Sequence, residues 1–69
     1  MANQEHLAIL REALDKEDIS IWNRWRSNNP NTKPNLSSAN LIGTYLSDVD
    51  LIGANLYKAD LSGAFMTRA

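Results

Sequence analysis

The sequence predicts a mainly β fold, a short solenoid of five-residue repeats preceded by one or two capping helices. Three observations lead to this prediction. An apolar residue returns at every fifth position from residue 36 to residue 66. A small residue usually stands two positions before it, and polar residues or glycines usually follow it. Before the repeats, residues 4–27 carry a helical pattern of leucines and tryptophans without glycine or proline.

Residues 34–68 divide into seven copies of one frame. In each copy a small residue, usually Ala, is followed by Asn or Asp, by an apolar residue and by two residues that fit a bend. Asn or Asp occupies the second position in five of seven copies, and Tyr45 and Phe65 are the exceptions. The apolar position holds Leu36, Leu41, Leu46, Leu51, Leu56, Leu61 and Met66.

A period of five residues excludes both a plain helix and a flat strand for this stretch. On an α-helix, five residues advance the side chain by about 140° beyond a full turn, so the leucines would have no common face. On a strand the side-chain period is two, so successive leucines would point to opposite faces. If a bend ends each short extended piece, every leucine can point to one axis, which is the pattern of a solenoid.

With this frame the sequence resembles the pentapeptide-repeat family over about half of its length. The resemblance implies a right-handed, four-sided β-helix in which four repeats make one coil, so that this chain has just under two coils. Residues twenty apart would then be stacked. The stacked pairs would include Leu36 on Leu56, Tyr45 on Phe65, and Asp48 facing Arg68, an aromatic pair and an opposite-charge pair being favourable neighbours between coils.

Residues 3–27 predict either one long helix or two short ones. Asn3 is a suitable N-cap, and the leucines at positions 7, 10 and 14 share one helix face. Asp15 and Asp18 are spaced like a capping pair, which predicts a second helix over about residues 16–27. We expect two helices, because one straight helix would extend beyond the repeats and expose half of its apolar stripe.

The predicted organisation is a helical cap and linker over residues 1–33 and the repeats over residues 34–69, within one structural domain. Residues 27–33 are rich in turn-forming residues and form the linker. The first coil of a solenoid exposes unpaired backbone and apolar side chains, and natural solenoids cover such ends. We expect Trp22 and Trp25 to cover this one.

Composition excludes several classes of function. A chain of 69 residues with a net charge of −1 gives no general attraction to nucleic acid or to an anionic membrane. Without cysteine and with His6 as its single histidine, it predicts no disulfide, metal, catalytic or cofactor site, and no small-molecule substrate. His6 is expected to be exposed or to cap the first helix. The start of the chain does not resemble a signal peptide, so a soluble cytoplasmic protein is expected.

Five residues are candidates for a contact surface. Tyr45 and Phe65 would form an exposed aromatic patch on one side of the coils. Met66 lies at the end that the helices would not cover. Trp22 and Trp25 pack on the first coil or, with Arg26, form a peptide-binding patch.

The sequence therefore predicts a non-catalytic structural or protein-interaction module. Its open C-terminal coil would dock end to end on a second copy or continue into a longer solenoid. The alternative comes from the family resemblance: some pentapeptide-repeat proteins are similar in shape and charge to DNA and act on type II topoisomerases. Such mimicry needs a long acidic rod, whereas this chain has fewer than two coils and a charge of −1.

Overall fold

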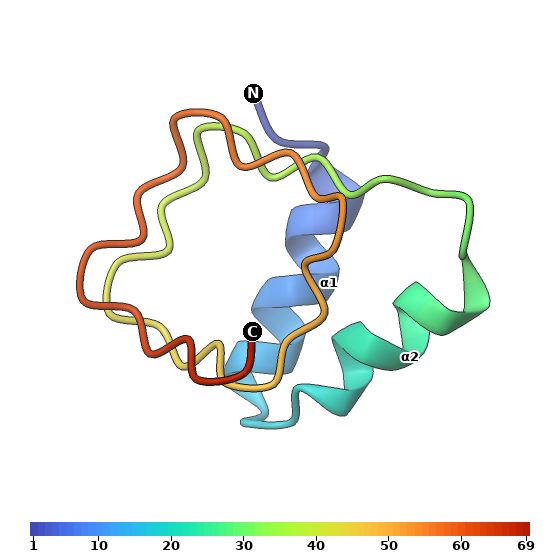
Figure 1. Cartoon of the computed structure of the whole chain (residues 1–69), viewed down its shortest axis with the longest axis horizontal. Coiled ribbons are helices and arrows are strands. Elements are labelled where there is room, and N and C mark those ends of the chain that lie inside the picture. Colours follow the sequence, from blue (N-terminus) through green and yellow to red (C-terminus); the bar gives the residue numbers. More distant parts are fainter.

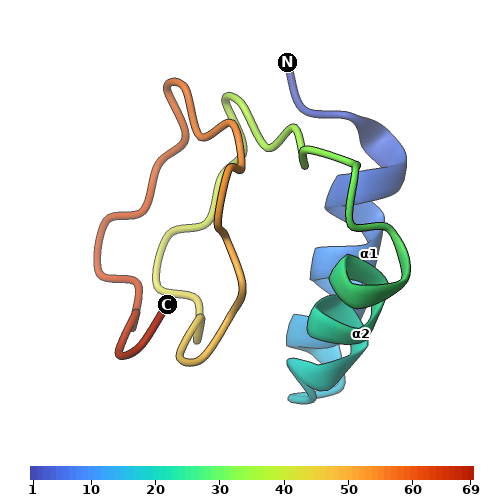
Figure 2. The ribbon, with the colours of Figure 1, turned by 45° about the vertical axis from the view of Figure 1, so that its right-hand side comes forward.

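The computed structural model describes residues 1–69 and arranges them in three layers. Helices α1 (Gln4–Asp15) and α2 (Ser20–Asn28) form the first layer. The repeats then wind into a first coil, residues 34–53, and a second, incomplete coil, residues 54–69 (Figure 1). Figure 2 shows the first coil between the helices and the second coil. The helices therefore cover one end of the repeats only.

Helix α1 begins and ends with well-defined caps. The Asn3 side chain accepts hydrogen bonds from the N–H groups of Glu5 and His6, so the predicted N-cap is confirmed. At the other end, the Asp18 N–H donates to the carbonyl of Ala13 at 2.9 Å, and Glu17, with φ +52°, adopts the left-handed conformation. This is the Schellman arrangement that commonly stops a helix.

The prediction of two helices is confirmed, but the predicted start of the second is wrong. Helix α2 begins at Ser20 rather than near residue 16, and its N-cap residue, Ile19, makes no side-chain capping bond. The Asp18 carboxylate, one residue earlier, accepts from the Ser20 N–H at 3.1 Å. Hydrogen bonds from the Ser20 hydroxyl and amide hold the pKa of Asp18 below its ordinary value. The Schellman turn occupies the residues that sequence pattern assigned to the helix, and no glycine marks it.

Every repeat ends in the same turn. The carbonyl of each inward apolar residue accepts a hydrogen bond from the N–H three residues later, in all seven copies. The last residue of each copy has a positive φ, between 59° and 73°. These residues are Ser38, Gly43, Asp48, Gly53, Lys58, Gly63 and Arg68. A positive φ confined to the third residue of the turn is the mark of a type II turn, which explains why glycine recurs there.

The Asn and Asp residues of the repeat have a local structural role. In each of the five copies that contain one, its side-chain oxygen accepts a hydrogen bond from the backbone N–H two residues later, at 3.0–3.2 Å. This bond shapes the chain before the turn, as in other Asx turns. Tyr45 and Phe65 break the pattern at equivalent positions of the two coils, so their copies lack the bond.

The coils are stacked with a period of twenty residues, as predicted. Parallel bridges join Asn35 to Asn55 and the corresponding pairs on two further sides. On the first side, Leu36 N–H donates to the Asn55 carbonyl, Asn55 N–H to the Pro34 carbonyl, and Ser38 N–H to the Tyr57 carbonyl, each at 2.8 Å. The other two sides repeat this pattern. The aromatic and opposite-charge pairs expected from the same period are also present.

The predicted mainly β class is wrong. Helices of 12 and 9 residues are the regular elements of the chain, and the repeats pair only through three isolated bridges, without a strand or a sheet. No strand forms because a turn ends every repeat, so that only one residue on each side can pair with the next coil. The molecule is two stacked, four-sided coils under a helical layer, and these coils pair without the strands of the expected β-helix.

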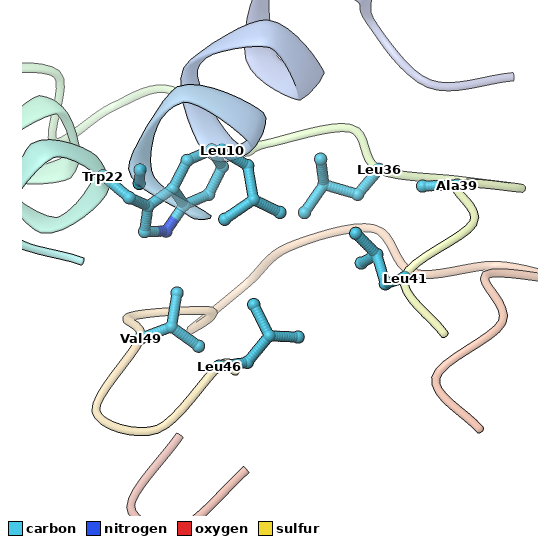
Figure 3. Packing of buried hydrophobic residues seen from close by; sticks show 8 residues of the cluster. Leu10, Trp22, Leu36, Ala39, Leu41, Leu46 and Val49 are labelled. Atoms are coloured by element: carbon cyan, nitrogen blue, oxygen red, sulfur yellow. The ribbon is translucent and has the colours of Figure 1, made fainter. Parts of the chain in front are cut away.

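The core lies between the helices and the first coil (Figure 3). Leu10, Ala13 and Trp22 enter it from the helices. The first coil contributes Leu36, Ala39, Leu41, Leu46 and Val49. Three of its four leucines, Leu36, Leu41 and Leu46, are fully buried, and burial of each such side chain contributes on the order of 2 kcal/mol.

Candidate interaction surfaces

The second coil leaves its inward side chains partly uncovered. Leu56, Leu61 and Met66 occupy the same repeat position as the buried leucines of the first coil, but all three are only half-buried. The second coil lies on the far side of the first coil from α1 and α2 (Figure 2). We call this surface the open face; it includes Leu51 of the first coil, on which no later repeat is stacked. Its other members are the inward residues of the second coil, Ala54, Leu56, Ala59, Leu61, Ala64 and Met66.

The open face also has unpaired backbone groups. Asn55 directs its own N–H and C=O to the first coil, so the flanking groups, Ala54 C=O and Leu56 N–H, point away from it. Neither makes a hydrogen bond within the chain, and the same holds for the groups that flank Asp60 and Phe65. The open face is therefore an uncovered coil end in both its side chains and its backbone.

At the opposite end, α1 supplies partners for the backbone of the first coil. The Asn35 C=O accepts from the N–H of Asn3 at 2.9 Å, and the Asn35 N–H donates to Nδ1 of His6 at 3.0 Å. His6 was expected to be exposed or to cap its helix, but it is half-buried and bonded to the repeats instead. Because Nδ1 accepts, the proton of the neutral ring lies on Nε2.

Helix α2 likewise supplies hydrogen-bond partners for the backbone on the fourth side of the first coil. The Asp50 N–H donates to Oδ1 of Asn23 at 2.8 Å, and the Asp50 C=O accepts from Nε1 of Trp22 at 2.8 Å. Arg26 donates to the Ile52 C=O at 2.6 Å. Three side chains of one helix thus replace the hydrogen bonds that a preceding coil would make.

The two tryptophans, both candidates for a contact surface, lie inside the helical cap. Trp22 is fully buried, and Trp25 is half-buried between His6 and Trp22, with ring centroids 5.0 Å from each. The Arg26 guanidinium bonds to backbone carbonyls of the first coil. The structure therefore leaves no exposed surface on Trp22 for a partner.

Tyr45 and Phe65 form an exposed aromatic pair across the two coils. Their rings are stacked, with centroids 4.9 Å apart and planes inclined by 10°, and 72% and 54% of the two residues is exposed. Beside them, Arg68 makes two hydrogen bonds to the carboxylate of Asp48. The Arg68 guanidinium holds the pKa of Asp48 below its ordinary value. This side of the coils therefore carries an exposed aromatic pair and an exposed ion pair.

A groove lies between this side and the turn that joins α1 to α2. Its volume is about 390 Å³, and it is lined by Ala13, Leu14, Glu17, Asp18, Ile19, Tyr45 and Ser47. The groove was not predicted, because its walls come from two segments that a repeat pattern does not relate. Tyr45, a predicted contact residue, forms part of one wall.

No cluster of three or more His, Asp or Glu side chains is placed to hold a metal ion. The Asp60 carboxylate accepts from the Ser62 hydroxyl at 2.6 Å, a local bond that holds its pKa below the ordinary value. Neither helix has the length and hydrophobicity needed to cross a membrane.

Stacked coils with one covered end and one open face define a small repeat protein. The family model for pentapeptide repeats (8 copies) matches residues 35–69, half of the chain. The chain therefore belongs to the pentapeptide-repeat family, and the resemblance drawn from the sequence is confirmed. Proteins of this family are in general non-enzymatic structural modules. No curated protein and no solved structure matches the chain.

Proposed function

We propose that the chain is a non-catalytic interaction module that associates with a second copy of itself through the open face. The observation that carries the proposal is the half-burial of Leu56, Leu61 and Met66, since the equivalent leucines of the first coil are fully buried. Docking a second copy would remove these side chains from water, with a gain of about 25 cal/mol per Å² of apolar surface buried.

The arrangement of the two copies follows from the covered end. Helices α1 and α2 occupy the position of a preceding coil, so a second copy cannot stack its open face there. The two open faces therefore meet each other, related by a twofold axis. Such a contact closes on itself and gives a dimer rather than a filament.

The unpaired backbone groups are compatible with this arrangement. A twofold axis makes the facing segments antiparallel. In an antiparallel ladder, every second pair of facing residues makes no hydrogen bond between its own backbone groups. The N–H and C=O groups on either side of such a pair form hydrogen bonds to the opposite segment. Asn55, Asp60 and Phe65 are each flanked by one free C=O and one free N–H. Each side of the coil thus offers one acceptor and one donor to its counterpart.

Solution mass tests the proposal directly. Light scattering over a roughly hundredfold concentration range should show a change from one chain to two, with a melting temperature that rises with concentration. A single-chain mass and a constant melting temperature at every concentration would reject self-association.

A matched pair of variants tests the surface. Met66→Lys introduces a charge into the open face and should weaken the dimer at least tenfold. Thr67→Lys adds the same charge to the neighbouring residue, which is exposed on the outer rim, and should leave the dimer unchanged. Melting at low concentration checks that both variants still fold. A dimer that withstands Met66→Lys would show that the copies meet elsewhere.

A further inference from the structure

The third side of the first coil has free backbone groups that face the helical layer. Leu46 N–H and Thr44 C=O are directed to the second coil, where they bond to Phe65 at 2.7 and 2.9 Å. Because backbone groups alternate in direction along an extended segment, the N–H and C=O of Tyr45 point the other way. Neither makes a hydrogen bond within the chain.

This side differs from its neighbours. The N–H and C=O of Asn35, on the first side, are both bonded to α1. Those of Asp50, on the fourth side, are both bonded to α2. On the second side, the Asn40 C=O has Arg11 as a partner at 3.5 Å. Tyr45 is thus the residue whose two groups the helices leave without a partner, and it lines the groove.

The walls of the groove indicate the chemistry of an occupant. Ala13, Leu14 and Ile19 provide apolar surface, and a volume of about 390 Å³ is enough for two or three side chains. Glu17 and Asp18 supply two carboxylates. The carboxylate of Asp18 is occupied by Ser20, whereas that of Glu17 has no hydrogen bond or ion pair. Arg24 and Lys16 are close enough to act on the Asp18 carboxylate, but neither lines the groove. The charged groups of its walls are both carboxylates, so an occupant with a positive charge is favoured.

The geometry points to a binding site in this groove for a short extended peptide that carries Lys or Arg. Its backbone pairs with the N–H and C=O of Tyr45, as a strand adds to an exposed edge. Its cationic side chain pairs with Glu17, and its apolar atoms contact Leu14 and Ile19. The site lies on the helical side of the first coil, so it is independent of the open face and of self-association.

The test uses a synthetic probe, acetyl-Thr-Lys-Val-Lys-Thr-amide, titrated into the isotopically labelled full chain and followed by NMR. We expect the amide signals of Glu17, Tyr45 and Ser47 to shift, and those of Leu56 and Leu61 on the open face to stay in place. A probe with N-methylated valine, which loses a backbone donor, should bind about fivefold more weakly. A probe with Glu in place of both Lys should bind at least fivefold more weakly.

The variant Glu17→Gly separates binding from folding. Glycine suits the left-handed conformation at this position, so the variant should be at least as stable as the natural chain. Loss of the carboxylate should nevertheless weaken the lysine probe about threefold. Glu12→Gln makes the same change of charge outside the groove, at the partner of Lys16, and should leave probe affinity unchanged.

Three results would overturn the site. One is the absence of shifts at Tyr45 and Ser47 at millimolar probe. Another is equal affinity of the N-methylated or charge-reversed probe. The last is unchanged affinity in the Glu17→Gly variant. None of these readouts depends on whether the chain forms a dimer, so this site and the open face are tested separately.

Discussion

The two coils are built from the same repeat but differ in how well they bury it. In the first coil, Leu36, Leu41 and Leu46 are fully buried. Twenty residues later, the side chains at the same position are half-buried. The side chains are almost the same, so the difference comes from the neighbouring layers. The first coil lies between helices and a coil, whereas the second has a neighbour on one side only (Figure 2). A repeat of this kind directs its leucines to the inside of the coil, but they are fully buried only where another layer packs on each side of that coil.

The largest expected difference between the coils is in their leucines. Leu41→Ala should lower the free energy of unfolding by about 3 kcal/mol, because it opens a cavity between two layers. Leu61→Ala, at the equivalent position of the second coil, should cost about half as much, because its side chain is already partly in water. Urea unfolding at low protein concentration measures both. Equal losses of stability would contradict the view that the first coil buries its leucines more completely. If Leu41→Ala does not fold, Leu41→Val is the milder substitution at the same position.

The next effect concerns the end that the helices cover. Trp22→Phe keeps most of the buried ring but removes the N–H that bonds to the Asp50 carbonyl, which should cost about 2 kcal/mol. Trp25→Phe is the matched control, because the indole N–H of Trp25 makes no hydrogen bond in the chain. Its loss of stability should therefore be smaller. Thermal unfolding compares the two. If both variants lose the same stability, the side-chain hydrogen bonds of α2 do not stabilise the first coil.

The turns should behave alike in both coils, unlike the leucines. Gly43 in the first coil and Gly63 in the second both have φ +68°, and a Cβ atom added to either would meet nothing within 4 Å. Substitution by Ala should therefore cost about 1 kcal/mol at each position, solely because of the left-handed conformation. Chemical denaturation of the two single variants provides the measurement. A clearly larger loss at Gly43 would mean that the turns, too, depend on the layers around them.

The smallest effect is the pH dependence of the ion pair that links the coils. Arg68 lowers the pKa of Asp48 in the folded chain from its ordinary value of 3.8. The stabilising contribution of the pair is therefore fully present above pH 3.8 and is lost as the pH falls below 3.8 through the lowered pKa. The stability difference between the natural chain and Asp48→Asn should shrink over that range. A difference that is constant from pH 6 to pH 2 would refute this assignment.

Much of the architecture could be predicted from the sequence, because it depends on side-chain spacing. The period of the leucines gave the inward positions, and the twenty-residue stacking then placed Tyr45 on Phe65 and Asp48 beside Arg68. The N-cap at Asn3 was also predictable, because its hydrogen bonds are local.

Features that depend on backbone detail or on long-range contacts were not predictable. The prediction of a mainly β fold was wrong because the spacing of the leucines does not reveal how many residues of each side can pair before the next turn. The turn at Glu17 has no glycine, so the start of α2 was misplaced. His6 and the groove depend on how α1 meets the first coil, and no repeat pattern relates those segments.

The twenty-residue stacking has a consequence for how the length of such a chain can change. Duplicating twenty residues would add a whole coil and keep every pair of neighbours between the older coils intact. Inserting a single repeat after Gly53 would instead rotate all later repeats by one side, so that Tyr45 would face Asp60 in place of Phe65. Insertions in multiples of four repeats therefore keep the pairing between sides, while any other number of inserted repeats exchanges the partners of every side.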